Sequence, residues 1–163
     1  NIPNVETALA YGVLCLLEGT NISEGRGTTL PILQFGSPFI KAEVLAKELN
    51  GLKFPSVIFT PAFFIPTFSK YKGELCEGVL LHITDYHEFR AVETGFRILF
   101  TIKRLYGDDF KLLPKEKENT HSFFTLLTGT ELFTKENTDI EELMEIFRKD
   151  SETFLSACKE YIL

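Results

Sequence analysis

The residues best suited to chemistry lie in one short stretch, residues 18–29. It contains two carboxylates, Glu18 and Glu24, one guanidinium, Arg26, and three glycines. Carboxylates and guanidinium groups bind or transform polar substrates, while glycine allows a close backbone approach. The other polar residues of the stretch offer hydroxyl and amide groups for hydrogen bonding, and they are Thr20, Asn21, Ser23, Thr28 and Thr29.

Two interpretations of this polar loop are open. It can bind or act on a polar ligand, because a loop with Ile22 as its one apolar residue contributes little hydrophobic burial. It can instead be a structural turn closed by a buried pair of Arg26 with Glu18 or Glu24, since ion pairs also serve structure.

The flanking sequence predicts elements that hold this loop. Residues 4–17 carry apolar side chains at helical spacing, with Asn4 as the N-cap and Gly19 as the stop. We expect a strand over residues 28–35 and a helix that opens at Ser37-Pro38 and runs to Leu49.

Later segments predict further strands and helices. A short strand is expected at residues 57–59 and a longer one at 74–83, where Gly78 indicates a bulge or a close backbone approach. Asp85 and Glu88 match a capping box that starts a helix ending at Gly107. A short helix is expected near residues 122–127, and Thr138 with Glu141 forms a second capping box before the C-terminal helical segment. The fold class predicted is α+β, with a small mixed or antiparallel sheet of three to five strands covered by about five helices.

Composition narrows the class of protein. The chain has 163 residues and a net charge of −6, which disfavours a nucleic-acid surface. Three separated cysteines give neither zinc spacing nor a disulfide framework. No apolar run is long enough for a membrane span. We therefore expect no metal, no cofactor, no nucleic acid and no membrane span in this chain.

The polar loop also carries a family resemblance. Read as EGTNISEGRGTTLP and followed by GSPFI, it resembles the C-terminal domain of the NamZ family, formerly a domain of unknown function. The likeness continues through PAFFIP at 61–66, CEGV at 76–79, HITD at 82–85 and LTGT at 127–130. Each piece is weak alone, but together and in this order they are specific.

The resemblance implies an activity. NamZ proteins are exo-acting β-N-acetylmuramidases, glycoside hydrolases that release terminal N-acetylmuramic acid from peptidoglycan fragments. Their active-site cleft lies between this domain and an N-terminal Rossmann-like domain, which residues 1–163 do not contain. We therefore expect one C-terminal domain that is inactive alone, with its own N-terminal domain and a muropeptide or disaccharide as partners. The family also implies export to the periplasm or the medium.

The resemblance assigns roles within the loop. Glu18 and Glu24 are the candidate catalytic carboxylates, although we expect the principal acid in the N-terminal domain. Arg26 is expected to bind the lactyl carboxylate of muramic acid, since a guanidinium can grip a carboxylate with two hydrogen bonds. The candidates for hydrogen bonds to the sugar are Thr20, Asn21, Ser23, Thr28, Thr29 and, on the strand, His82.

Two other functions remain open at this point. The first is a carbohydrate-binding module that does not hydrolyse its ligand, and the second is a docking module for its own N-terminal partner.

Overall fold

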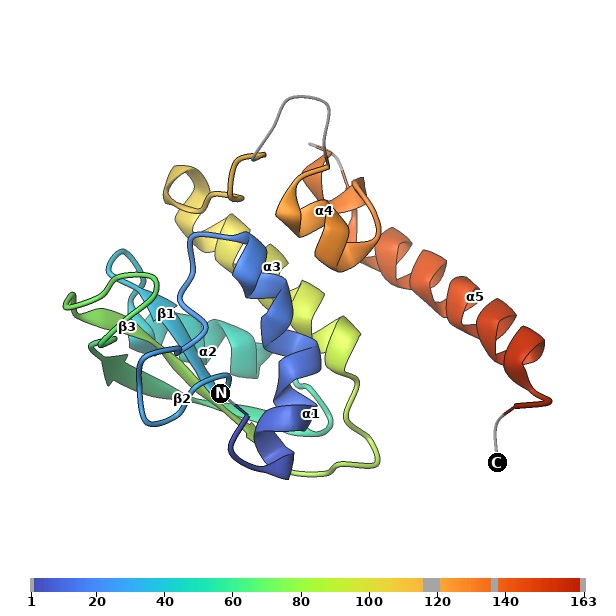
Figure 1. Ribbon diagram of the computed structural model, residues 1–163, viewed down its shortest axis with the longest axis horizontal. Coiled ribbons are helices and arrows are strands. Elements are labelled where there is room, and N and C mark those ends of the chain that lie inside the picture. The colour runs from blue at the N-terminus through green and yellow to red at the C-terminus, as the bar shows by residue number, and fades with distance from the viewer. Residues whose placement is uncertain (1, 116–120, 136–137, 162–163) are drawn as a thin grey trace. The chain divides into compact units, whose positions relative to one another are not determined.

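The computed structural model describes residues 2–115, 121–135 and 138–161. These residues form two compact units, Asn1–Thr128 and Gly129–Leu163, and each is described by itself. The first unit contains the polar loop and all three strands (Figure 1).

The sheet of the first unit is antiparallel. Its strands are β1 (Gln34–Ser37), β2 (Val57–Phe64) and β3 (Cys76–Ile83), in the order β1-β3-β2. β2 is longer than predicted and contains Pro61, which an edge strand tolerates because one side of its backbone needs no partner. Together with the five α-helices among the described residues, this sheet confirms the predicted α+β class and the predicted small sheet.

Helices cover one face of the sheet and pack on one another. α2 (Ala42–Gly51) lies against β2 and β3, whereas α1 (Val5–Leu14) packs along α3 (Ala91–Tyr106) (Figure 1). Asn4 caps α1 as predicted, because its side chain accepts a hydrogen bond from Thr7 N at 2.8 Å. The core between these elements includes the fully buried side chains of Leu14, Phe35, Leu45, Phe59, Phe96 and Leu99.

β1 and β3 approach one another very closely where two glycines face each other. Gly36 pairs with Gly78 in the register of the two strands. A Cβ atom added to Gly78 would overlap the backbone carbonyl oxygen of Phe35, and one added to Gly36 would overlap that of Glu77. The close approach predicted at Gly78 is therefore confirmed.

The predicted first residue was wrong for one strand and two helices. Residues 28–33 form turns, with Ile32 at a φ of 64°, so β1 begins only at Gln34. α2 begins at Ala42 and not at Pro38, because β1 continues through Ser37. α3 begins at Ala91, because Asp85 caps a local turn through its bonds to the backbone N–H groups of His87 and Glu88.

The first unit ends with α4 (Phe123–Thr128), close to the predicted range. The second unit holds a 3₁₀ turn, η3 (Leu132–Thr134), and a single long helix, α5 (Ile140–Cys158). Asp139 caps α5 through Glu141 N, whereas the Thr138 hydroxyl bonds to Leu132 O, so the predicted capping box was wrong by one residue. Among the described residues, no helix is long and apolar enough to cross a membrane.

Candidate functional site

The polar loop is anchored at both ends. It leaves a 3₁₀ turn, η1 (Cys15–Gly19), that continues from α1. The buried Thr20 hydroxyl donates to Leu17 O at 2.9 Å and accepts from Ile22 N at 3.1 Å. Ser23 then exchanges two backbone hydrogen bonds with Gly36 of β1, at 2.8 and 3.0 Å. The loop is thus attached to the helix on one side and to the sheet edge on the other.

Four charged side chains form what we call the ion cluster: Glu18, Glu24, Arg26 and Lys70. Arg26 Nη2 donates to Glu18 Oε1 at 2.5 Å, and Arg26 Nε lies 3.1 Å from Glu24 Oε1. The second oxygen of Glu24 accepts from Lys70 Nζ at 3.1 Å. Two negative and two positive charges therefore alternate, and the cluster is neutral overall.

Burial separates the cluster into an inner and an outer part. The Glu24 side chain is only 4% exposed, whereas those of Glu18, Lys70 and Arg26 are 19%, 21% and 26% exposed. Within the described residues, Arg26 Nη1 donates no hydrogen bond. Glu18 and Arg26 are thus the members of the predicted site that can meet a ligand, and Glu24 lies behind them.

Lys70 is a member of the ion cluster that the sequence analysis missed. Its ammonium group donates to three backbone carbonyls, those of Leu17 at 2.9 Å, Glu18 at 3.3 Å and Ile22 at 2.9 Å, besides Glu24. Burial lowers the pKa of Lys70 below the ordinary 10.5, and this effect outweighs the opposing attraction of Glu24. No motif marks a lysine that lies 46 residues from its carboxylate partner.

Tyr11 is a second residue that the sequence analysis missed. The negative charge of Glu18, together with partial burial, raises the pKa of the Tyr11 hydroxyl. The seven-residue spacing from Tyr11 to Glu18 is the signal that could have found it, since such positions share one helix face. For Arg26, burial lowers the pKa, but the hydrogen bond that Arg26 donates to Glu18 and the negative charges of both carboxylates outweigh burial and raise the pKa.

Most of the predicted sugar-binding side chains of the loop bind the chain itself. Asn21 donates to Asp109 O and accepts from Lys111 N, both at 2.8 Å, which ties the loop to the segment after α3. The Ser23 hydroxyl accepts from Gly25 N, and the Thr28 hydroxyl donates to Gly25 O. Thr29 is exposed and makes no hydrogen bond with other described side chains.

His82 lies apart from the loop residues. It is on β3, where its Nε2 is 2.8 Å from the hydroxyl of Thr60 on β2. Neither a hydrogen bond nor an ion pair joins it to the ion cluster within the described part of the chain. The roles assigned to His82 and to the loop residues stay predictions.

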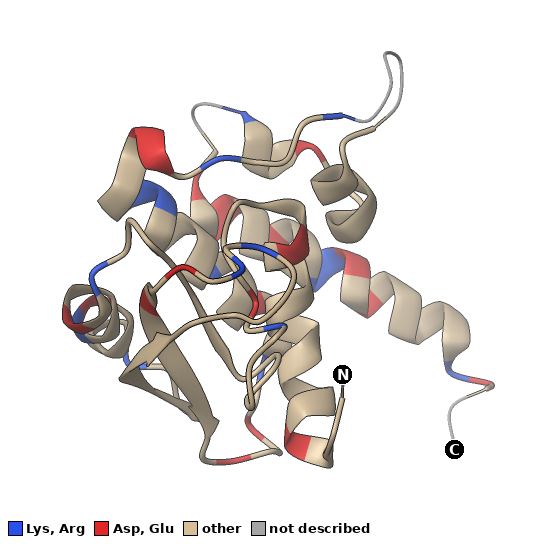
Figure 2. Cartoon of the chain, turned by 60° about the vertical axis from the view of Figure 1, so that its left-hand side comes forward, with Lys and Arg blue, Asp and Glu red and all other residues tan. Residues whose placement is uncertain are grey.

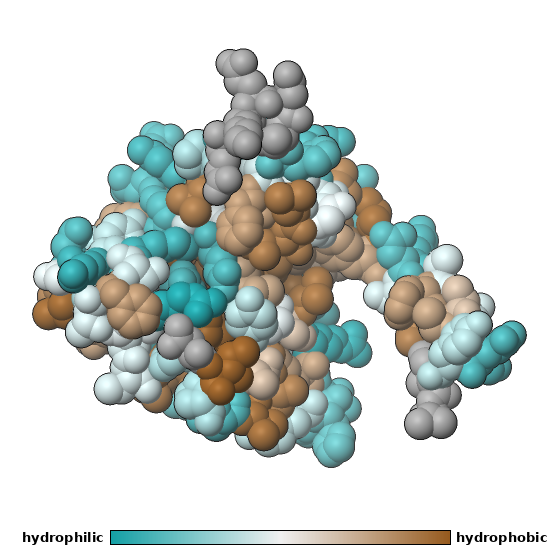
Figure 3. All heavy atoms as spheres, viewed as in Figure 1, coloured by the Kyte–Doolittle hydropathy of each residue, from teal (hydrophilic) through white to brown (hydrophobic). Residues whose placement is uncertain are grey.

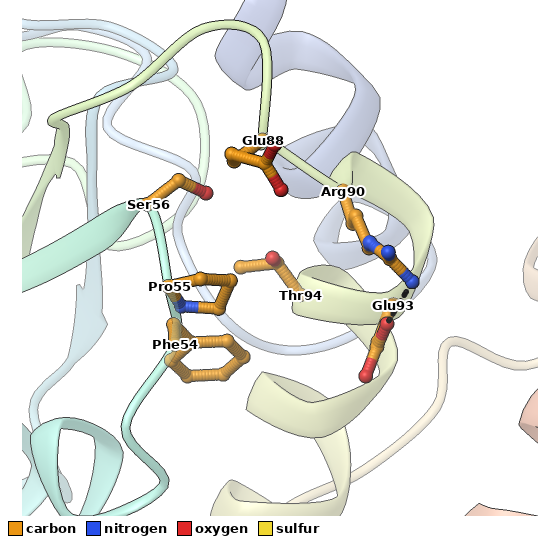
Figure 4. A pocket seen from close by; sticks show the side chains of 7 residues that line it. All are labelled: Phe54, Pro55, Ser56, Glu88, Arg90, Glu93 and Thr94. Carbon is orange, nitrogen blue, oxygen red and sulfur yellow. Dashed lines mark ion pairs between the residues drawn. The ribbon is translucent and has the colours of Figure 1, made fainter.

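A separate pocket of about 180 Å³ opens between the start of β2 and the start of α3. Figure 4 shows its lining, in which Ser56, Glu88 and Thr94 point oxygen atoms inward beside Phe54 and Pro55. It contains none of the residues predicted from the sequence.

Charged side chains of both signs are interspersed over the described part of the chain (Figure 2). Among the described residues, no group of three or more His, Cys, Asp or Glu side chains is placed to hold a metal ion.

Comparison with known proteins agrees with the family resemblance. Residues 9–163 match the family model described as exo-beta-N-acetylmuramidase NamZ, C-terminal. The peptidoglycan beta-N-acetylmuramidase NamZ of Bacillus subtilis (strain 168) is 44% identical over 165 residues, which cover 100% of this chain and 39% of that protein. The chain thus spans well under half the length of this relative.

Two solved structures from Bacteroides fragilis NCTC 9343 share the fold, and both are described as DUF1343 family proteins. One has a TM-score of 0.85 and 29% identity, covering 99% of this chain and 43% of that one. The other has a TM-score of 0.61 and 24% identity, covering 99% and 41%. Because the family model matches nearly the whole chain, this chain belongs to the NamZ family and corresponds to its C-terminal region.

Proposed function

We propose that this chain is the C-terminal, cleft-forming domain of a longer exo-β-N-acetylmuramidase that releases terminal N-acetylmuramic acid from peptidoglycan fragments. Membership of the NamZ family supports this activity. The observation within the chain that carries the proposal is the outer edge of the ion cluster, where Glu18 and Arg26 are partly exposed on a firmly anchored loop.

The arrangement of the carboxylates supports a shared active site. Glycosidases commonly use two carboxyl groups that face one bond across a gap of several ångströms. Here the guanidinium of Arg26 lies between Glu18 and Glu24 and pairs with both. The two carboxylates cannot act together on one glycosidic bond while that group stays in place. We therefore infer that the principal acid comes from the N-terminal part of the protein.

Arg26 is suited to recognise muramic acid. Its Nη1 retains its hydrogen-bonding capacity within the described residues, and its side chain is partly exposed. The lactyl carboxylate of muramic acid would offer two oxygens to this group. Since the ion cluster is neutral, a ligand anion meets no net repulsion from it. N-acetylglucosamine has no such carboxylate, so Arg26 would discriminate between the two sugars.

The N-terminal part of the same protein is the proposed partner of the segment between β2 and β3. This segment exposes the apolar side chains of Ile65, Phe68 and Leu75, with Phe63 at the end of β2. It is joined to the polar loop, because Thr67 donates to Gly27 O from its backbone and from its hydroxyl, both at 2.9 Å. Hydrophobic atoms also interrupt the polar surface on the face drawn in Figure 3. We further propose that the protein is exported, as its substrate would require.

Substituting the two loop carboxylates in the full-length protein tests the catalytic part of the proposal. Glu18→Gln and Glu24→Gln should each lower kcat/KM for a chromogenic muramic acid glycoside by about 10- to 100-fold. Glu18 is the carboxylate that can meet the substrate, and either substitution misplaces Arg26. Glu43→Gln is the matched control, because Glu43 is exposed on α2 and lies outside both the ion cluster and the segment between β2 and β3. If both loop variants stay within a few-fold of the wild type, neither carboxylate is catalytic.

A further inference from the structure

We propose that Lys70 is a positioning residue that holds the polar loop in its working arrangement. Its ammonium group fixes the inner carboxylate, Glu24, and the backbone of the loop, so that Glu18 and Arg26 are presented outward. The inference rests on the function proposed above, and it gives a role to a residue that lies outside the loop sequence.

The surroundings of Lys70 require a cation. Four oxygen atoms converge on Nζ: three backbone carbonyls, at 2.9, 2.9 and 3.3 Å, and one carboxylate oxygen of Glu24, at 3.1 Å. An ammonium group has three donors and no acceptor, so these contacts use its full capacity. An uncharged side chain here would leave the buried Glu24 without one of its two cations and several carbonyls without a donor.

The backbone on both sides of Lys70 is strained. Ser69 has a φ of 70° and Tyr71 a φ of 57°, left-handed values that are uncommon for residues other than glycine. Such conformations persist where the surrounding contacts determine them, and they concentrate at functional sites. Between these two residues, the Lys70 side chain reaches the carbonyls of the loop, and the Tyr71 hydroxyl donates to Asn21 O at 2.6 Å.

The segment that carries Lys70 therefore attaches to the polar loop at three successive points. Thr67 bonds to Gly27 O, Lys70 reaches the carbonyls of residues 17–22, and Tyr71 bonds to Asn21 O. Because its donors all point inward, Lys70 acts through Glu24 and does not itself contact substrate. Without its charge, two carboxylates would compete for Arg26, and the guanidinium would be drawn toward the buried one.

Hydrogen exchange of the full-length protein tests the positioning directly and does not depend on turnover. Lys70→Met has nearly the same length as lysine but no charge, and it should speed backbone exchange in peptides from residues 15–30. Lys47→Met is the matched control, since Lys47 is exposed on α2, away from the segment between β2 and β3, and it should leave exchange in these peptides unchanged. If these peptides exchange at the same rate in Lys70→Met as in the wild type, the proposal is overturned.

Kinetics test whether this positioning matters for the reaction. On a chromogenic muramic acid glycoside, Lys70→Met should lower kcat by about 10- to 100-fold with a smaller change in KM. A loss of this size is expected when reacting groups are displaced by up to about 1 Å. The double variant Lys70→Met/Glu24→Gln removes one charge of each sign, so its loss should be smaller than the product of the two single losses. Losses that simply multiply would contradict action through Glu24.

The two possible failures can be distinguished. If Lys70→Met alone does not fold, the double variant Lys70→Met/Glu24→Gln can be compared with Glu24→Gln for both exchange and kcat. If the wild type does not cleave the muramic acid glycoside, the proposed function is wrong, and the exchange comparison still decides whether Lys70 holds the loop. If the wild type is active and Lys70→Met has normal kcat, the proposal about Lys70 is wrong and the proposed function stands.

Discussion

At the scale of single residues, the polar side chains of the loop divide into two groups. Thr20, Ser23 and Thr28 bond to the loop's own backbone, and Asn21 bonds to the segment after α3. Glu18 and Arg26 remain partly exposed. Residue types singled out the loop and its three charged residues, which the structure brings together in the ion cluster. Residue types alone could not separate side chains that shape the loop from those that are able to meet a ligand.

Asn21 should be important for stability although it was expected to bind sugar. Asn21→Ala loses two hydrogen bonds that join distant segments, and it should lower the free energy of unfolding by about 1–2 kcal/mol. Thr29→Ala, in the same loop but exposed, should change it by less than about 0.5 kcal/mol. Urea denaturation of the full-length protein measures both. Equal stabilities for the two variants would argue against a structural role for Asn21.

At the scale of elements, the pairing of β1 with β3 determines where the loop can lie. Ser23 bonds to Gly36 on β1, and Gly36 faces Gly78 on the central strand. A side chain at either glycine would push β1 away from β3 and move the anchor of the loop with it. The two glycines thus link the packing of the sheet to the geometry of the ion cluster.

This close approach predicts a large effect of one methyl group. Gly78→Ala should destabilise the protein by about 2–3 kcal/mol, the usual cost of overpacking a buried position. Gly51→Ala, at the end of α2 with open space around it, should be neutral or stabilising by about 0.5 kcal/mol. Chemical denaturation compares the variants, and a Gly78→Ala protein as stable as the wild type would show that the strands can separate without cost.

Local patterns predicted which elements exist better than where they begin. Helical spacing of apolar residues identified α1, α2 and α3, because burial of one face drives their packing. The first residue of a helix depends on which backbone N–H groups a capping side chain binds. Asp85 lies in a sequence typical of a helix cap, yet its carboxylate accepts from His87 N and Glu88 N and closes a turn that ends at the pocket-lining Glu88. Lys70 could not be predicted either, since tertiary contact alone brings it to Glu24.

At the scale of the whole molecule, we propose that another part of a longer protein completes the site. It covers 39% of its Bacillus subtilis relative, and the segment that touches the polar loop exposes Phe63, Ile65, Phe68 and Leu75. The neutral ion cluster has one guanidinium between two carboxylates. These features support our proposal that this domain recognises and orients substrate while another part of the protein supplies the principal acid.

The most direct test compares two substrates in one variant. In the full-length protein, Arg26→Ala should lower kcat/KM for a chromogenic muramic acid glycoside by about 10- to 150-fold, which corresponds to a hydrogen bond to a charged group worth about 1.5–3 kcal/mol. The same variant should affect the corresponding N-acetylglucosamine glycoside much less, so that discrimination between the two sugars is lost. Equal losses on both substrates would show that Arg26 only holds Glu18 and Glu24 in place, and would contradict the account.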